Sequence, residues 1–142
     1  MPDIIHIVTI KATPDKVFEL LSTPEGLNRW WTKDCKGRPE LGSIYHLDFG
    51  SVVWQCQVTD LLQDQELEYT LSKSDEDWLD TQVRFELEAN SDGTKLKFKH
   101  LGWAHANDHF HGSNHCWGLY LRVLRRYIEF GEEVSYENRL VV

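Results

Sequence analysis

The segment from Phe110 to Gly131 reads FHGSNHCWGLYLRVLRRYIEFG and is the only long run with helical periodicity in this 142-residue chain. Its apolar residues recur at helical spacing and form a wide face beside a narrow polar arc. A helix of this kind must be covered over most of its circumference by a large apolar partner. The predicted apolar face consists of Cys116, Trp117, Leu119, Tyr120, Leu121, Val123, Leu124, Tyr127, Ile128 and Phe130.

The partner is predicted by the residues between position 40 and this helix, which alternate between apolar and polar as half-buried strands do. Short breakers such as Phe49-Gly50-Ser51 separate the runs and favour hairpins, and therefore an antiparallel meander. The inward face is predicted to carry Tyr45, Leu47, Phe49, Val52, Trp54, Cys56, Val58, Leu67, Tyr69, Leu71, Val83, Phe85, Leu87, Leu96, Phe98 and His100.

The N-terminal part predicts a strand over residues 4–11 and then two short helices. Thr13-Pro14 and Thr23-Pro24 each combine a capping residue with a proline at the first helical position. Trp30-Trp31 is expected to close the second helix, with one ring pointing inward and the other at the rim, as a gate or as a packing plug. We therefore expect an α+β domain spanning residues 1–142, with about five or six strands after the short helices and the long helix across the concave face of one curved sheet.

The composition narrows the classes of partner. With 23 Asp and Glu residues against 15 Lys and Arg, the net charge is −8, so neither nucleic acid nor an acidic membrane surface is expected to bind. No stretch approaches the roughly 20 apolar residues of a membrane span, and the N-terminus does not resemble a signal peptide. Cys35, Cys56 and Cys116 are odd in number and widely spaced, which suits reduced thiols. These observations favour a cytoplasmic protein that is not integral to a membrane.

Four stretches together resemble the helix-grip fold of the START-like, or SRPBCC, superfamily, and more narrowly the family named for the activator of heat shock protein 90 ATPase. The family usually has a glycine pair where this chain has Leu41-Gly42, and a proline in the turn that here reads Gln63-Asp64-Gln65. The resemblance implies a seven-stranded antiparallel sheet, a cavity in which apolar ligands are bound or transformed, and no family-wide catalytic residue. The stretches are IKATPDKVFELLSTPEGLNRWW (10–31), PELGSIYHLDFG (39–50), VTDLLQDQELEYTL (58–71) and FELEANSDGTKLKFKHLGW (85–103), which leads into the helix that ends RRYIEFG.

Aromatic side chains dominate the two surfaces that are expected to face each other across this cavity. Small-molecule sites are usually lined by apolar and aromatic groups with a few polar tips. The alternative is that these aromatic residues only fill the core. The predicted ligand-binding residues are Trp31, Tyr45, Phe49, Trp54, Tyr69, Phe85, Phe98, His100, Trp117, Tyr120, Leu121 and Leu124.

Histidines gather around the start of the long helix. His111 and His115 are four residues apart, so a helix would place both imidazoles on one face, as metal ligands need. No HExxH motif and no evident carboxylate triad completes the set, so neither a metal nor another cofactor is expected. His100 continues the inward phase of its strand and is the candidate general base or ligand anchor, with a purely structural histidine as the alternative.

Three functions fit these observations. The leading hypothesis is that the protein binds a small apolar or amphipathic molecule, without chemistry that the sequence specifies. An interaction module resembling a chaperone activator would instead use its outer surface to bind a chaperone or a second copy, and an exposed apolar patch near Trp78 or on the tail 135–142 would favour it. An enzyme of the cyclase or dehydratase kind would use His100 or a pocket tyrosine as acid or base.

Overall fold

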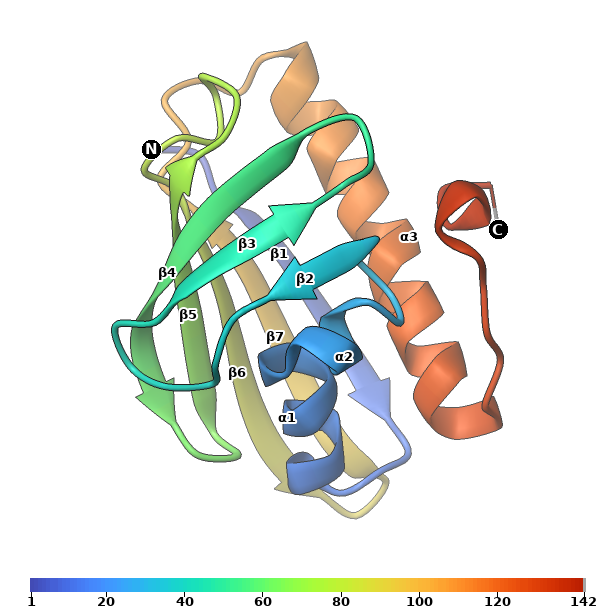
Figure 1. Ribbon diagram of the computed structural model, residues 1–142. Helices are drawn as coiled ribbons and strands as arrows, with labels where there is room; N and C mark the ends of the chain where they lie inside the picture. The colour runs from blue at the N-terminus through green and yellow to red at the C-terminus, as the bar shows by residue number, and fades with distance from the viewer. Residues whose placement is uncertain (142) are drawn as a thin grey trace.

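The alternating segments pair into one antiparallel sheet in the computed structural model, which describes residues 1–141. The strands are ordered β1-β7-β6-β5-β4-β3-β2. A long helix crosses the open side of the sheet, and two short helices lie near one end (Figure 1). The elements are β1 (Ile4–Ile10), α1 (Pro14–Ser22), α2 (Pro24–Leu27), β2 (Asp34–Lys36), β3 (Ile44–Asp48), β4 (Val53–Leu62), β5 (Glu66–Lys73), β6 (Gln82–Asn90), β7 (Gly93–Leu101), α3 (Asp108–Phe130) and the 3-10 turn η1 (Tyr136–Asn138).

The β6–β7 hairpin shows how the period-2 pattern builds the core. Phe85 pairs with Phe98 across the hairpin, and both side chains are buried. The next pair along, Glu86 with Lys97, points to the other face and brings opposite charges together. The predicted alternation in β5, β6 and β7 is confirmed, because Leu67, Tyr69, Leu71, Val83, Phe85, Leu87, Leu96, Phe98 and His100 are all buried.

The short helices differ from the prediction in one respect. Thr23 caps α2 by accepting a hydrogen bond from the Gly26 amide at 2.9 Å, as the Thr-Pro signal indicates. The helix nevertheless ends at Leu27, so Trp30 and Trp31 lie in the turn that follows. Both rings are buried there, as in the packing-plug alternative and not with one ring at the rim, because this turn folds beneath α3 and both indoles reach its core-facing side.

Three other expectations need correction. β2 lies in a segment that reads as a turn, since three residues are too short to show a period; Cys35 is its one inward residue. Val52 precedes β4 and is exposed. The apolar face of α3 is narrower than predicted: its buried residues form a stripe that includes Trp117, Leu121 and Leu124, while Phe130 at its end is 64% exposed. Only part of the helix circumference is covered.

The chain after α3 forms a C-terminal strap, residues 131–141, that runs back beside the helix (Figure 1). The Tyr136 hydroxyl donates to the Phe49 carbonyl at 2.9 Å. The buried Arg139 guanidinium donates to the carbonyls of Thr32, Asn28 and Val134, which ties the strap to the turn after α2. The strap is thereby held against the β3–β4 hairpin.

Gly93 should be the least replaceable residue of the sheet turns. A Cβ built on Gly93 would lie 2.3 Å from the Ile10 carbonyl oxygen, at a φ of +132°. Gly42 also has a positive φ, but no atom lies within 4 Å of its Cβ position. We expect Gly42→Ala to lower the free energy of unfolding by about 1 kcal/mol through backbone strain. Gly93→Ala should cost about 3 kcal/mol or more, because the end of β1 must also move. Denaturant unfolding of both variants tests this, and equal losses would contradict it.

Candidate functional site

A mostly apolar cavity of about 420 Å³ lies between the first half of α3 and the end of the sheet formed by β3 and β4. Five separate segments supply its walls: the turn after α2, the β3–β4 hairpin, the loop between β5 and β6, α3 and the C-terminal strap. The lining residues are Trp31, Phe49, Val52, Trp54, Trp78, His109, Gly112, Ser113, Cys116, Trp117, Tyr120 and Tyr136.

Five of the aromatic side chains that line the cavity contact one another in a closed cycle, which we call the aromatic ring of Trp31, Phe49, Trp54, Trp78 and Trp117. Neighbouring ring centroids lie 5.2–5.7 Å apart. Four of the five contacts have interplanar angles between 43° and 74°, and the remaining one, Trp78 with Trp117, is stacked. Contacts at such spacings and inclinations are favourable for aromatic pairs. The side chains therefore support one another as walls.

Trp117 connects the cavity to a buried polar chain. Its indole N–H donates to Nδ1 of His100 at 3.1 Å. Because Nδ1 accepts, the proton of a neutral imidazole is on Nε2, which donates to the Thr81 hydroxyl at 2.8 Å. That hydroxyl donates in turn to the Trp78 carbonyl at 2.6 Å. Both imidazole nitrogens are thus satisfied inside the protein.

His100 lies behind the cavity wall and does not border the cavity. Burial, with a smaller contribution from the nearby His109, lowers the pKa of His100 from 6.5 to about 3. A second proton would also set an N–H of His100 against the indole N–H of Trp117. These contacts give His100 a structural role and leave no free nitrogen for a substrate.

The structure divides the predicted ligand-binding residues into two groups. Trp31, Phe49, Trp54, Trp117 and Tyr120 border the cavity. The others fill the packed core: α1 covers Tyr45 and Tyr69, and the rings of Trp78, Trp103 and Trp117 surround His100. The Tyr69 hydroxyl donates to the Leu21 carbonyl at 2.7 Å and the Tyr45 hydroxyl to the Ser22 carbonyl, so both polar tips are satisfied by α1. The residues that the structure places in the core are Tyr45, Tyr69, Phe85, Phe98, His100, Leu121 and Leu124.

Sequence patterns did not indicate that Trp78 and Tyr136 line the cavity. Trp78 lies in the polar loop SDEDWLD, where no period marks it as inward, and Tyr136 lies beyond the last long helix. The one signal available in the sequence was a tryptophan in an otherwise charged loop. Ser113 and Cys116 occupy the helix stripe that also carries Trp117 and Tyr120, so their approach to the cavity follows from helical spacing.

Few polar groups reach the cavity. Ser113 Oγ accepts from the Trp78 indole N–H at 3.3 Å. Burial raises the pKa of the Tyr120 hydroxyl to about 12, and it also raises the pKa of the Cys116 thiol. Both groups are therefore neutral near pH 7, and no lining residue is Lys, Arg, Asp or Glu. The site is built to hold an apolar surface.

His109 lies at the rim of the cavity beside two carboxylates. Its Nδ1 lies 2.8 Å from an Asp77 carboxylate oxygen, and its Nε2 lies 3.6 Å from one of Asp75. The hydrogen bond from His109 lowers the pKa of Asp77. These contacts join the start of α3 to the loop that carries Trp78.

The two candidate metal ligands, His111 and His115, are exposed on α3. Within residues 1–141 no group of three or more His, Cys, Asp or Glu side chains is arranged to hold a metal ion. In the same part of the chain, no helix is both long and apolar enough to span a membrane. Cys35, Cys56 and Cys116 are free thiols.

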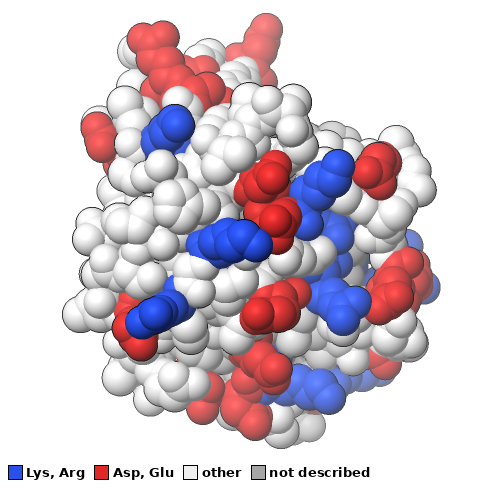
Figure 2. All heavy atoms as spheres, viewed as in Figure 1, with Lys and Arg blue, Asp and Glu red and all other residues white. Residues whose placement is uncertain are grey.

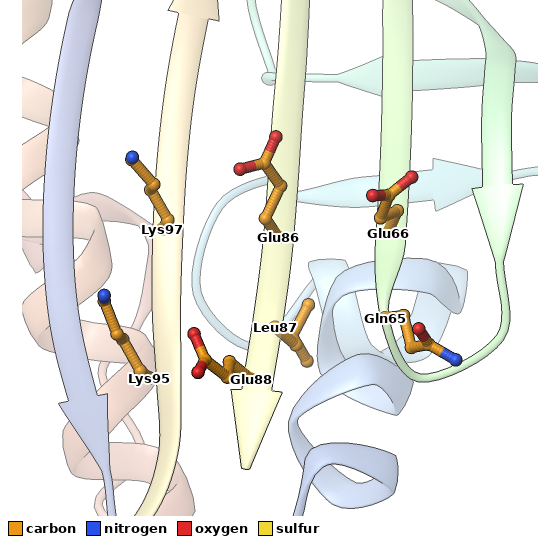
Figure 3. Close-up of a pocket in the computed structure, with 7 residues that line it drawn as sticks. All are labelled: Gln65, Glu66, Glu86, Leu87, Glu88, Lys95 and Lys97. Carbon is orange, nitrogen blue, oxygen red and sulfur yellow. The ribbon is translucent and has the colours of Figure 1, made fainter. Parts of the chain in front are cut away.

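A second hollow, of about 280 Å³, lies on the outer face of the sheet and is lined by charged side chains of β5, β6 and β7 (Figure 3). Two of its acidic groups are paired with basic side chains of the sheet: Glu86 contacts Arg84 at 2.8 Å and Lys99 at 3.1 Å, and Glu66 contacts Arg84 at 3.1 Å. On the face shown in Figure 2, acidic and basic residues are likewise interspersed. These charges form a solvated surface, so the aromatic cavity is the better candidate site.

Comparison with known proteins shows a matching family and several similar structures. The family model described as "Activator of Hsp90 ATPase homolog 1-like protein" matches residues 11–129. The Aha1 dimer from Colwellia psychrerythraea is 30% identical, with a TM-score of 0.85 over 93% of this chain and 99% of that one. A Bacillus halodurans protein is 27% identical, with a TM-score of 0.78 over 91% and 98%. CalU16 from Micromonospora echinospora, at 19% identity and a TM-score of 0.77 over 98% and 81%, shares the fold. No curated protein has a matching sequence.

His100 should make the protein less stable in acid. The unfolded chain binds a proton at this imidazole below pH 6.5, whereas the folded protein does so only near pH 3. Acid therefore favours unfolding, and the free energy of unfolding should fall by about 1.4 kcal/mol for each pH unit in this window. Carboxylates such as Asp60, whose pKa is lowered by its hydrogen bond from Arg84, act in the same direction. The variant His100→Gln keeps these carboxylates, and its side chain still offers an acceptor and a donor but does not titrate. Denaturant unfolding from pH 7 to pH 4 should show a shallower slope for the variant, and identical slopes would contradict this account.

Proposed function

Since this chain belongs to the family of activator of Hsp90 ATPase homolog 1-like proteins, we propose that it binds a small apolar or amphipathic molecule in the aromatic cavity. The observation that carries the proposal is the aromatic ring around a space of about 420 Å³. Ligand sites commonly have volumes of about 300–1,000 Å³, apolar and aromatic walls, and a few polar groups that orient the ligand. Ser113 and Tyr120 are the polar groups suited to that task.

The same geometry supports binding without catalysis at this site. His100 is buried behind the wall with both nitrogens occupied, so it cannot reach a ligand. Tyr120 and Cys116 have raised pKa values and no carboxylate or imidazole partner that would activate them. General acid–base catalysis needs a group within hydrogen-bond reach of the reacting proton. In this proposal the cavity therefore holds its ligand unchanged.

A second candidate function is interaction with a chaperone through the outer surface. The family name and the 30% identity to the Colwellia Aha1 favour it, and the dimeric state of that relative makes a second copy of this chain another candidate partner. Trp78 is buried and offers no surface patch, but Leu140 and Val141 of the strap are 43% and 77% exposed. Exposed apolar groups of this kind can mark an interaction site.

Gly112 offers a direct test of the cavity. It lines the cavity within α3, and a Cβ built there meets no atom within 4 Å. Gly112→Leu should fill the space while making the helix slightly more favourable. We expect the neutral fluorescent probe N-phenyl-1-naphthylamine to bind the wild-type protein, and Gly112→Leu to weaken binding at least about tenfold, the effect expected when a bulky side chain occupies the apolar volume.

Gly112→Ala is the matched control, because its methyl group leaves most of the volume free. It should bind the probe within about twofold of wild type, with both variants at least as heat-stable as wild type. Failure of the wild-type protein to bind any neutral apolar probe would overturn the proposal.

Under the second candidate function, the Gly112→Leu variant would still stimulate the host chaperone, whereas removal of residues 140–142 would abolish this stimulation.

A further inference from the structure

Aromatic side chains form most of the cavity walls. Aliphatic side chains would have suited an alkyl ligand equally well. Neighbouring rings among Trp31, Phe49, Trp54, Trp78 and Trp117 are 5.2–5.7 Å apart, and most are inclined to one another. Rings at this spacing touch one another, so a group that rests against the wall they form lies within ~6 Å of more than one ring centroid, the range over which an aromatic face attracts a cation. Tryptophan is the strongest of the aromatic residues in this respect, and it supplies four of the five rings.

We propose that the cavity selects ligands that carry a quaternary ammonium group, held by the aromatic ring through cation–π attraction. This inference rests on the proposed function, because it specifies the ligand class of the same site.

The charges around the cavity are consistent with a cation. No lining residue is Lys, Arg, Asp or Glu, and the imidazole of His109, which lines the cavity, is paired at the rim with the carboxylates of Asp75 and Asp77. The chain as a whole has a net charge of −8, which attracts cations and repels anions before they reach the site. An anionic headgroup would find no Lys or Arg in the cavity walls, and at the rim His109 is already paired with the carboxylates of Asp75 and Asp77.

Arg139 is a competing cation that lies behind Tyr136 and does not line the cavity. Its guanidinium lies 5.6 Å from the centroid of the Tyr136 ring and is absent from the cavity lining. It is only 5% exposed, and its N–H groups donate to the carbonyls of Val134, Thr32 and Asn28. Its charge is therefore solvated by backbone dipoles, away from a bound ligand.

The shortage of acceptors selects a quaternary ammonium over an amine. A primary ammonium brings three N–H donors, each of which would need a partner in the cavity. The walls offer little beyond Ser113 and Tyr120, and Ser113 already accepts from Trp78. A methylated nitrogen has no N–H, spreads its charge over its methyl groups, and leaves no donor unsatisfied.

Three probes of nearly equal shape separate charge from size: choline, 3,3-dimethyl-1-butanol and 3,3-dimethylbutanoate, which are cationic, neutral and anionic. Each is titrated at low salt while the indole N–H signals are followed by NMR, with Trp103, which is outside the cavity lining, as the internal reference. We expect choline to bind about tenfold more tightly than the alcohol, and the carboxylate to bind most weakly.

Trp54 is the residue to vary, because it is only partly buried, and its two aromatic neighbours in the ring are Phe49 and Trp78. Trp54→Leu removes a ring but keeps an apolar side chain, whereas Trp54→Phe keeps a ring. Choline affinity should fall about fivefold in Trp54→Leu and at most about twofold in Trp54→Phe. Affinity for 3,3-dimethyl-1-butanol should change less than twofold in both variants.

The outcomes separate this inference from the proposed function. If N-phenyl-1-naphthylamine binds but choline binds no more tightly than the alcohol, or binds undetectably, the cation inference is overturned while the apolar site stands. If the carboxylate binds best, the inference is also overturned, and Arg139 becomes the group to examine. If the naphthylamine does not bind to wild type, the proposed function fails and this inference fails with it.

Discussion

Trp117 imposes the constraint on which the rest of the structure depends. Its ring must be buried for α3 to dock, and it packs against Phe98 at 4.5 Å and Trp31 at 5.2 Å between centroids. Burial of the indole also requires an acceptor for its N–H, since an unpaired donor would be costly. His100 provides that acceptor only while it is neutral. Docking of the helix, the protonation of His100 and the position of the Trp78 loop, reached through Thr81, are therefore one linked arrangement.

The two ends of the sheet are closed in different ways, and this difference creates the cavity. At one end α1 packs into the sheet, and its last carbonyls accept the hydroxyls of Tyr45 and Tyr69. At the other end no helix enters. The start of α3, the β3–β4 hairpin and the C-terminal strap approach from the sides, and Tyr136 holds the strap to Phe49. Rigid aromatic rings span the remaining space without filling it, since a ring cannot bend into a gap as an aliphatic chain can.

Local patterns predicted much of this architecture. The alternation in β6 and β7 indicated which side chains point inward, and Thr23-Pro24 indicated where α2 begins. The cavity lining was harder to anticipate. Tyr69 and Trp54 both lie in strands with an inward phase, yet Tyr69 is capped by α1 and Trp54 borders the cavity. Trp78 and Tyr136 lie in segments without any period, so nothing local marked them. The family resemblance supplied the helix-grip topology, and the family match and the fold confirm it.

The sequence by itself determined the class of fold, the inward and outward directions of the residues in β5, β6 and β7, and the centre of the apolar stripe of α3. These are local properties, because backbone geometry repeats every two residues in a strand and every 3.6 in a helix. Only the tertiary structure decided which inward residues fill the core and which surround a cavity, and that His100 serves Trp117 instead of a ligand. A cavity is the volume left after segments distant in sequence have packed, as Trp31, Trp78 and Tyr136 do here. Its position therefore depends on how the α1–α2 elbow, α3 and the strap meet, which no local period records.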